Sequence, residues 1–359
     1  MRTPLVALAV LLLGCGDNSA TPTDAALGSP LPPPPDADLH GLPAADPALL
    51  QKIFNEVDGD RIVKTLRETS GVDPVMINGQ MVTIDQRFDD AGRKRFRDYF
   101  TQTMTGLGLE VHDIPYQAAG HPRPGNDVEA VLRGTVDDSF VVIVHYDSIG
   151  PKGLETQNPG ADDDMTGMAI LFETARLFAA HHAEIPLTVR FVASDEEELG
   201  GLGGARFYAA SITAQAKAGG FAVVAAVDDE QSGWNCSKDN RCGDNVFPAI
   251  DIFSCGSTQD RSESFDFPQL GNQFEAIVHQ YSTLNVKRGC LGANSDHFAM
   301  WERGVPAIVY SEHNPFANPH FDREGGDTFD KIDTDYLISI ARPAITFQAQ
   351  LVRIHAPPP

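Results

Sequence analysis

The stretch "SFVVIVHYDS", from Ser139 to Ser148, contains a continuous run of apolar, β-favouring residues over Phe140–Val144. A run of this kind predicts a strand that is buried on both faces, as in the interior of a parallel sheet. Two residues with polar chemistry, His145 and Asp147, follow directly where the apolar run ends. The stretch therefore predicts a central strand with a reactive carboxyl end.

The sequence on either side continues this pattern. Further apolar strands are expected in "LTVRFVAS" (187–194), "GFAVVAAV" (220–227), "FPAIDIFS" (247–254) and "VPAIVY" (305–310). Helical segments separate them, for example "MTGMAILFETARLFAAHH" (165–182), whose apolar residues recur at helical spacing. The alternation predicts an α/β fold: one domain over residues 46–359, with a mostly parallel mixed sheet covered by helices on both faces.

The N-terminus has the features of an export signal. Residues 1–14 combine Arg2 with an apolar run that is too short to span a bilayer, and "LLGC" resembles the cleavage box of bacterial lipoproteins. We therefore expect a lipoprotein-type signal peptide, with lipidated Cys15 as the only membrane contact, facing the periplasm or the cell surface. A plain secretory signal is the alternative. Residues 15–45 are rich in Pro and Ala and are expected to form a tether.

Composition narrows the range of partners and the redox environment. The formal net charge of −23 argues against binding to nucleic acid, which needs clustered Lys and Arg. Without Cys15, four cysteines remain, and an even number in an exported protein suggests disulfides. Of the three possible pairings, we favour Cys236–Cys242 with Cys255–Cys290, because the first pair closes the short polar loop "CSKDNRC".

Residues that commonly bind metals follow the apolar segments again and again. They are His145 and Asp147, Asp162–Asp164 before a helix, Asp195–Glu198, Asp228–Glu230, and His313 with His320. Each has an ordinary explanation, since an acid before a helix can be a cap and a run of acids can be a solvated loop. In a parallel sheet, however, the carboxyl ends of the strands meet at one edge, where ligands bind.

So many carboxylates at one edge would repel one another unless cations neutralise them. Imidazole and carboxylate groups without a thiolate are suited to zinc or a similar divalent ion. The sequence therefore predicts a metal site at the carboxyl edge of the sheet.

The motifs also carry a family resemblance. His145-x-Asp147, "PGADDDMTG", "DEEELGGLGG", Asp228, "SDHFAMWERGVPA" and "PHFDREGGDTFDKID" occur in the order seen in the di-zinc exopeptidases. That family includes secreted bacterial leucine-type aminopeptidases and has glutamate carboxypeptidase and glutaminyl cyclase relatives. The similarity covers approximately Asp85 to Ile354, and the set of motifs is far more specific than any one of them.

The resemblance implies two zinc ions per chain and a role for each matching residue. His145 and Asp228 would hold one zinc, Glu198 and His320 the other, and Asp163 would bridge them. Two further residues would be catalytic: Glu197 as the general base and Asp147 as the partner of the second ring nitrogen of His145. Some assignments stay open: His313 competes with His320, and Asp229 or Glu230 could replace Asp228. An oxyanion donor is expected elsewhere, at Tyr310 or Tyr281.

The function implied is hydrolysis of the N-terminal peptide bond of peptide substrates, that is, a metallo-aminopeptidase. A carboxypeptidase of the same fold would need a cation for the terminal carboxylate, for which Arg206, Lys287 and Arg288 are candidates. A glutaminyl-cyclase-like acyltransferase would not need a second metal. A non-catalytic binding domain would be expected to have lost metal ligands, and none is missing from this sequence.

Overall fold

The computed structural model describes residues 42–117, 124–149, 158–258, 262–292, 294–320 and 326–357. The predicted signal peptide, Cys15 and most of the predicted tether lie outside the described residues. No helix within the described ranges is both long and apolar enough to cross a membrane.

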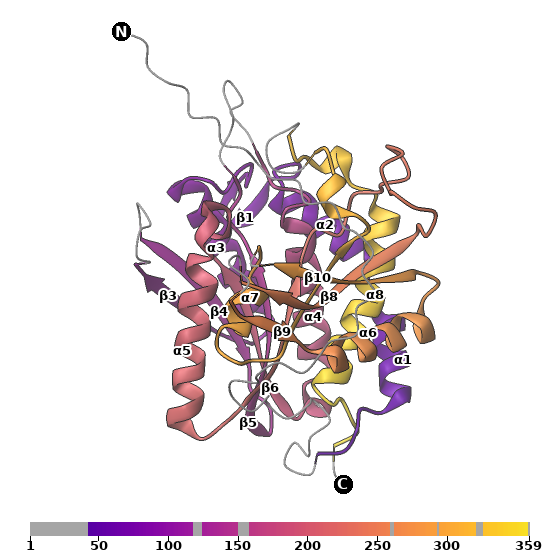
Figure 1. Cartoon of the computed structure of the whole chain (residues 1–359). Coiled ribbons are helices and arrows are strands. Elements are labelled where there is room, and N and C mark those ends of the chain that lie inside the picture. The colour runs from indigo at the N-terminus through magenta and orange to yellow at the C-terminus, as the bar shows by residue number, and fades with distance from the viewer. Residues whose placement is uncertain are drawn as a thin grey trace. The chain divides into compact units, whose positions relative to one another are not determined.

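A mixed sheet of nine strands forms the centre of the fold (Figure 1). Its order is β10-β8-β11-β7-β5-β6-β4-β3, and β9 pairs with β8. The strands are β3 (Glu110–Tyr116), β4 (Gly125–Leu132), β5 (Val136–His145), β6 (Leu187–Ser194), β7 (Val223–Asp229), β8 (Ala249–Ser257), β9 (Ser264–Asp266), β10 (Asn285–Gly292) and β11 (Ala307–Glu312). A separate hairpin pairs β1 (Val75–Ile77) with β2 (Gln80–Val82).

The four central strands β11, β7, β5 and β6 run parallel to one another. Antiparallel pairs join them to β8 on one side and to β4 on the other, and β4 pairs with β3 in the same way. Because the central four share one direction, their carboxyl ends meet at one edge, as the sequence predicts. The strands near the ends of the sheet, β3, β4 and β10, were not expected, because polar residues break up their apolar pattern.

Helices cover both faces of the sheet (Figure 1). They are α1 (Pro47–Glu56), α2 (Gly59–Thr69), α3 (Asp90–Gly106), α4 (Met165–Ala180), α5 (Gly203–Gly219), α6 (Pro268–Tyr281), α7 (His297–Trp301) and α8 (Thr334–Leu351), with short helical turns at His182–Glu184, Glu197–Gly201, Pro315–Ala317 and Phe329–Lys331. This architecture confirms the predicted α/β class with helices on both faces.

Alternation along β5 explains how one strand serves two cores. Phe140, Val142 and Val144 pack in the larger core, with α4, α6 and α8, whereas Val141 and Ile143 pack in the smaller core, with α5 and α7. All five side chains are completely buried. A strand between two cores must be apolar on both faces, and the uninterrupted apolar run of β5 meets this requirement.

Both preferred disulfides are confirmed. Cys236 and Cys242 are bonded and close a loop after β7, and Cys255 and Cys290 join the neighbouring strands β8 and β10. The first link closes a loop that follows β7 at the carboxyl edge, whereas the second lies toward the opposite edge, because Cys255 comes two residues after Phe253, the partner of Val309 in antiparallel β11.

His313 links the segment that follows the first of these loops to the sheet. Its ring Nδ1 lies 2.7 Å from Asp251 Oδ1 of β8, and Nε2 lies 3.0 Å from Asp244 Oδ1. Asp244 also pairs with Lys287 of β10 at 2.7 Å, and the Tyr336 hydroxyl accepts a hydrogen bond from the His313 backbone N–H. Burial alone would lower the pKa of His313, but the bonds to both carboxylates outweigh it and raise the pKa above its ordinary value.

This raised pKa predicts a pH-dependent contribution to stability. The stabilisation is fully present below the unfolded-state pKa of about 6.5 and is lost as the pH rises through the higher folded-state pKa. We expect His313→Gln to lower the melting temperature more at pH 5.5 than at pH 9, as measured by circular dichroism. The control is His279→Gln, on the exposed surface of α6. An equal loss at both pH values would contradict this prediction.

Candidate metal centre

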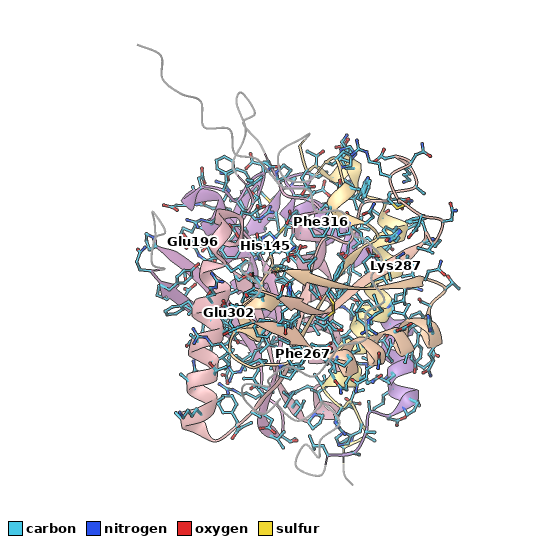
Figure 2. All side chains as sticks on the ribbon, in the orientation of Figure 1. His145, Glu196, Phe267, Lys287, Glu302 and Phe316 are labelled. Atoms are coloured by element: carbon cyan, nitrogen blue, oxygen red, sulfur yellow. A yellow bond between two sulfur atoms is a disulfide. The ribbon has the colours of Figure 1, made fainter. Side chains whose placement is uncertain are left out.

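Four chain segments converge at the carboxyl edge of the central strands. His145 ends β5, the acids Asp195–Glu198 follow β6, Glu230 follows β7, and the turn Asp162–Asp164 leads into α4. Figure 2 places His145 among the side chains of this region, with the exposed Phe316 from the segment after β11. His145 and Glu230 therefore contribute to one site although they are 85 positions apart in the sequence.

Three side chains form a group that fits a divalent metal. One ligand atom each from His145, Asp163 and Glu230 lies within 4.8 Å of the others, and all three residues are buried. His145 Nε2 lies 2.9 Å from Asp163 Oδ1, and Gln231 Nε2 donates to the other oxygen, Asp163 Oδ2, at 3.0 Å. One imidazole and two carboxylates are the donor types that zinc prefers.

The buried acids of this region have raised pKa values. Burial, with repulsion from Asp228, raises the pKa of Glu230 to about 8. Burial likewise raises the pKa of Glu197 well above its usual range; nearby His145 opposes the shift, and Glu198, Glu230 and Asp163 add to it. Carboxyl groups so perturbed would hold protons near neutral pH, and a dication among them would restore the ionised form.

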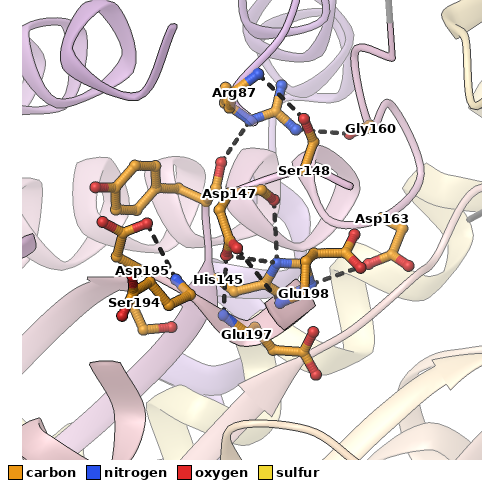
Figure 3. A network of polar contacts seen from close by, with 12 residues as sticks. Arg87, His145, Asp147, Ser148, Gly160, Asp163, Ser194, Asp195, Glu197 and Glu198 are labelled. Atoms are coloured by element: carbon orange, nitrogen blue, oxygen red, sulfur yellow. Dashed lines mark hydrogen bonds and ion pairs between the residues drawn. The ribbon is translucent and has the colours of Figure 1, made fainter. Parts of the chain in front are cut away.

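Asp147 links the loop after β5 to the loop after β6 (Figure 3). His145 Nδ1 lies 3.3 Å from the Asp147 backbone oxygen and 3.6 Å from its carboxylate Oδ1. The same carboxylate accepts the backbone N–H groups of Glu197 at 3.1 Å and Glu198 at 3.3 Å. Asp147 thus holds both glutamates in place while it lies beside the histidine ring.

Glu197 and Glu198 occupy the turn Glu197–Gly201, and both line the cavity at the site. Glu198 Oε1 accepts the backbone N–H of Ile149 at 3.2 Å. The two side chains therefore reach the same cavity from one tight turn.

The three consecutive aspartates have separate contacts. Asp164 caps α4 by accepting the Gly167 N–H at 3.0 Å, which is the ordinary explanation for one of the three. Asp162 accepts the Gly233 N–H and the Asn318 side-chain amide, 2.8 and 2.9 Å away. Asp163 alone faces the cavity.

Asp327 fixes this aspartate turn from the far end of the chain. Its two carboxylate oxygens accept the backbone N–H groups of Asp162 and Asp163, each at 2.8 Å, and its side chain is buried. The motif "GGDTFDKID" contained this residue, but nothing in the sequence indicated which backbone groups it binds.

We expect Asp327→Asn to weaken zinc binding by about 10- to 100-fold, the usual loss when a supporting residue of a metal site is changed. The asparagine amide group is a donor, so it would oppose one of the two N–H groups. Competition with a chromogenic chelator measures the effect. Asp330→Asn is the matched control, since that exposed carboxylate contacts Thr328 and Lys331 and lies outside the metal site. Unchanged zinc affinity in Asp327→Asn would contradict this account.

The structure places Glu230, not Asp228, within reach of His145 and Asp163. The strand β7 runs two residues past the predicted end, to Asp229, so Asp228 is still paired with Ile143 and Val309. Asp228 Oδ2 accepts the Ser295 hydroxyl and the His297 N–H, both at 2.8 Å, and lies 2.9 Å from His297 Nδ1. Glu230 lies two positions further along, which is about 7 Å nearer the edge.

Ser295 connects these two acids, because its hydroxyl also contacts Glu230 Oε1. Asp228 therefore supports the site through Ser295, a contact that the sequence did not predict. Gln231, the partner of Asp163, is a second contributor that no sequence pattern indicated.

Neither His313 nor His320 lies in the three-residue group. His313 contacts Asp244 and Asp251. His320 Nε2 lies 3.5 Å from Asp239 Oδ2, and the His320 backbone N–H donates to Asn318 Oδ1 at 2.9 Å. Asn318 in turn donates to Asp162, so the His320 segment is tied to the aspartate turn.

The proposed oxyanion donors lie elsewhere. Tyr310 is buried against Phe274 in the larger core, and Tyr281 packs on Phe54 of α1. Neither tyrosine lines the cavity in the described part of the chain.

The cavity has a volume of about 230 Å³ and a lining that combines acidic with other residues. The acidic residues are Asp163, Glu197, Glu198 and Glu230. Its other residues are Gln231, Phe253, Leu291, Asn294, Ser295, Val309, Ser311, Pro315 and Phe316. Among the described residues it has no lysine or arginine in its lining. The cavity can therefore accept an apolar side chain beside a cation or an amine.

Comparison with known proteins shows which families and proteins this chain resembles. Residues 127–348 match peptidase family M28. A "Probable leucine aminopeptidase" of Trichophyton verrucosum is 25% identical over 236 residues, which cover 63% of this chain and 57% of that protein. A "Probable zinc metalloprotease" of Pyricularia oryzae is 29% identical over 224 residues, 51% of this chain and 43% of that protein. The chain spans about half the length of the curated relatives it matches.

Solved structures share the fold. The LapA aminopeptidase of Legionella pneumophila superposes with a TM-score of 0.63 at 18% identity, covering 87% of this chain and 76% of that one. A Fimbriiglobus ruber glutaminyl cyclase superposes with a TM-score of 0.58 at 19% identity, covering 82% and 96%. At these identities the likeness concerns the fold alone.

Proposed function

The chain belongs to peptidase family M28, and on that premise we propose that it is a di-zinc aminopeptidase. Its class, a zinc metallopeptidase, comes with the family. The observation that carries the finer proposal is the buried group of His145, Asp163 and Glu230, of which Asp163 and Glu230 line a cavity together with Glu197 and Glu198. Relatives named leucine aminopeptidases support it.

In this proposal His145, Glu230 and Asp163 would hold one zinc, and Asp163, Glu198 and His320 would hold a second. Glu230 takes the place that the sequence first suggested for Asp228. When bound, the zinc ions supply Lewis acidity, which polarises the scissile carbonyl and lowers the pKa of water. Glu197 is the general base: its carboxylate accepts the proton of the attacking water and then donates it to the leaving amine.

The chain's own residues favour cleavage at the amino end. A substrate's free N-terminal ammonium would lie near the acidic residues of the cavity, and its first side chain would contact the apolar lining residues Phe253, Leu291, Val309 and Phe316. A first residue with an apolar side chain is therefore the preferred substrate. Because only a terminal residue has that amine beside its carbonyl, internal bonds would be poor substrates.

The cations that a carboxypeptidase would need are engaged elsewhere. Arg206 pairs with Glu302, Lys287 with Asp244, and Arg288 with Glu275. These pairs are at least partly exposed and lie outside the cavity lining. Among the described residues, no lysine or arginine lines the cavity to bind a terminal carboxylate.

A lipoprotein anchored by Cys15 and facing the periplasm or the cell surface remains part of the proposal. The two disulfides agree with export to an oxidising compartment. Mass spectrometry of the mature N-terminus tests the anchor: a lipid-modified peptide beginning at Cys15 supports it, and an unmodified peptide that begins elsewhere refutes it.

A panel of peptides tests the activity. We expect cleavage of free-amine peptides with leucine or phenylalanine first, no cleavage of their N-acetylated forms, and little effect of a C-terminal amide. A chelator should abolish cleavage, and zinc should restore it. Cleavage of the N-acetylated peptides from their carboxyl end would indicate a carboxypeptidase instead. Cyclisation of an N-terminal glutamine peptide without hydrolysis of the others would indicate an acyltransferase.

A further inference from the structure

Arg87 is a completely buried cation whose side-chain hydrogen bonds go to backbone carbonyl groups (Figure 3). It lies between β2 and α3, before the residues that match the peptidase family. Its Nε donates to Tyr146 O at 2.6 Å, Nη1 to Thr69 O at 3.1 Å, and Nη2 to Gly160 O at 3.0 Å. Nη1 also donates to Pro159 O.

These carbonyl groups belong to both turns that carry proposed zinc ligands. Tyr146 separates His145 from Asp147, and Pro159-Gly160 leads into the turn with Asp163. One guanidinium group thus spans the end of β5 and the start of the aspartate turn. The Thr69 carbonyl anchors the same group to the end of α2.

Ser148 forms a second link between the same two turns. Its hydroxyl oxygen accepts the Arg87 backbone N–H at 3.1 Å and donates to Asn158 O at 3.0 Å. The Asn158 side chain returns a hydrogen bond to Ile149 O, also at 3.0 Å. Both links between the two turns therefore include Arg87, one through its side chain and the other through its backbone N–H.

The surroundings are built closely around this side chain. Gly160 has a φ of +55°, and a Cβ there would lie 2.6 Å from Arg87 Nη2 and 2.4 Å from Asp163 O. Burial lowers the pKa of Arg87 to about 10, against the attraction of Asp327, Asp147, Asp164 and Glu198, so it stays charged at neutral pH. Burying a charge is costly, and only arginine offers this planar fork of five donors.

We propose that Arg87 is a positioning residue of the metal centre: it sets the separation of His145 and Asp163 by holding both of their turns. The inference rests on the proposed function, because it takes these two residues as zinc ligands. It also assigns the segment before the family match a part in the site.

Arg87→Lys tests this proposal, since lysine keeps the charge and loses the fork. Zinc affinity is measured by chelator competition, well below the melting temperature of each metal-free protein. We expect about 10- to 100-fold weaker zinc binding and a lower kcat at saturating zinc, with KM within about twofold. Arg95→Lys is the control, because Arg95 forms a partly exposed ion pair with Asp85 of 3.1 Å; it should bind zinc as the wild type does.

Ser148→Ala provides a milder variant if Arg87→Lys does not fold. Removing its hydrogen bonds should weaken zinc binding about two- to tenfold. Wild-type zinc affinity in the folded Arg87→Lys protein would overturn the role of Arg87. If only Ser148→Ala folds, wild-type zinc affinity in that variant would do the same. Either result would leave the proposed function unaffected. A wild-type protein that binds no zinc would overturn both.

Discussion

Replacing Glu197 by glutamine is expected to lower kcat by about 10²- to 10⁴-fold, the contribution that general acid–base catalysis usually makes. The amide has nearly the shape of the carboxylate but cannot accept the proton of the attacking water. Glu197 lines the cavity, and its backbone N–H is bound by Asp147, so the substitution should leave the turn in place. Steady-state kinetics on an aminoacyl-anilide gives the loss.

The zinc content of the Glu197→Gln protein distinguishes a general base from a zinc ligand. Glu197→Gln should retain two zinc ions per chain, whereas a variant that had lost a ligand would not. Glu302→Gln is the control, because Glu302 pairs with Arg206 at the surface and should have no effect on kcat. Wild-type turnover in Glu197→Gln would remove this residue from the base role, and loss of zinc would make it a ligand instead.

The second large effect is expected at Glu230. Glu230→Gln should weaken zinc binding by more than about 100-fold, because it removes a ligand and not a supporting group. Asp228→Asn should cost only about 10- to 100-fold, since Asp228 acts through Ser295 and His297. Isothermal titration with zinc of both metal-free variants measures the difference. A larger loss in Asp228→Asn would contradict the assignment and restore Asp228 as the ligand.

Much of the fold could be predicted because its central strands have simple patterns. The strand expected at 187–194 is the observed β6, and the run Phe140–Val144 lies inside β5. Strands buried on both faces must be apolar throughout, so their sequences are unambiguous. The outer strands β3 and β10 have one exposed face and mixed composition, which gives no comparable signal.

The site was predictable where the position of a residue follows from the end of a strand. His145 and Asp163 come together as expected, since each lies at the carboxyl edge. Asp228 and Glu230 could not be separated, because they are two positions apart and point to the same side of β7. Only the observed length of that strand decides which one reaches the cavity.

Hydrogen bonds between a side chain and a distant backbone group could not be predicted from the sequence. Arg87 and Asp327 bind main-chain groups of residues 18 to 165 positions away, and such bonds impose no recognisable pattern. The contact of His320 with Asp239 depends likewise on a loop closed by the Cys236–Cys242 disulfide.

The central claim is that two dications hold the histidine and the acids of this edge together. Its most direct test is a crystal grown with excess zinc, with diffraction data collected at the zinc absorption edge. We predict two anomalous peaks, one bounded by His145, Asp163 and Glu230 and the other beside Asp163 and Glu198. No peak at the first position, or one between Asp228 and His297, would contradict the account.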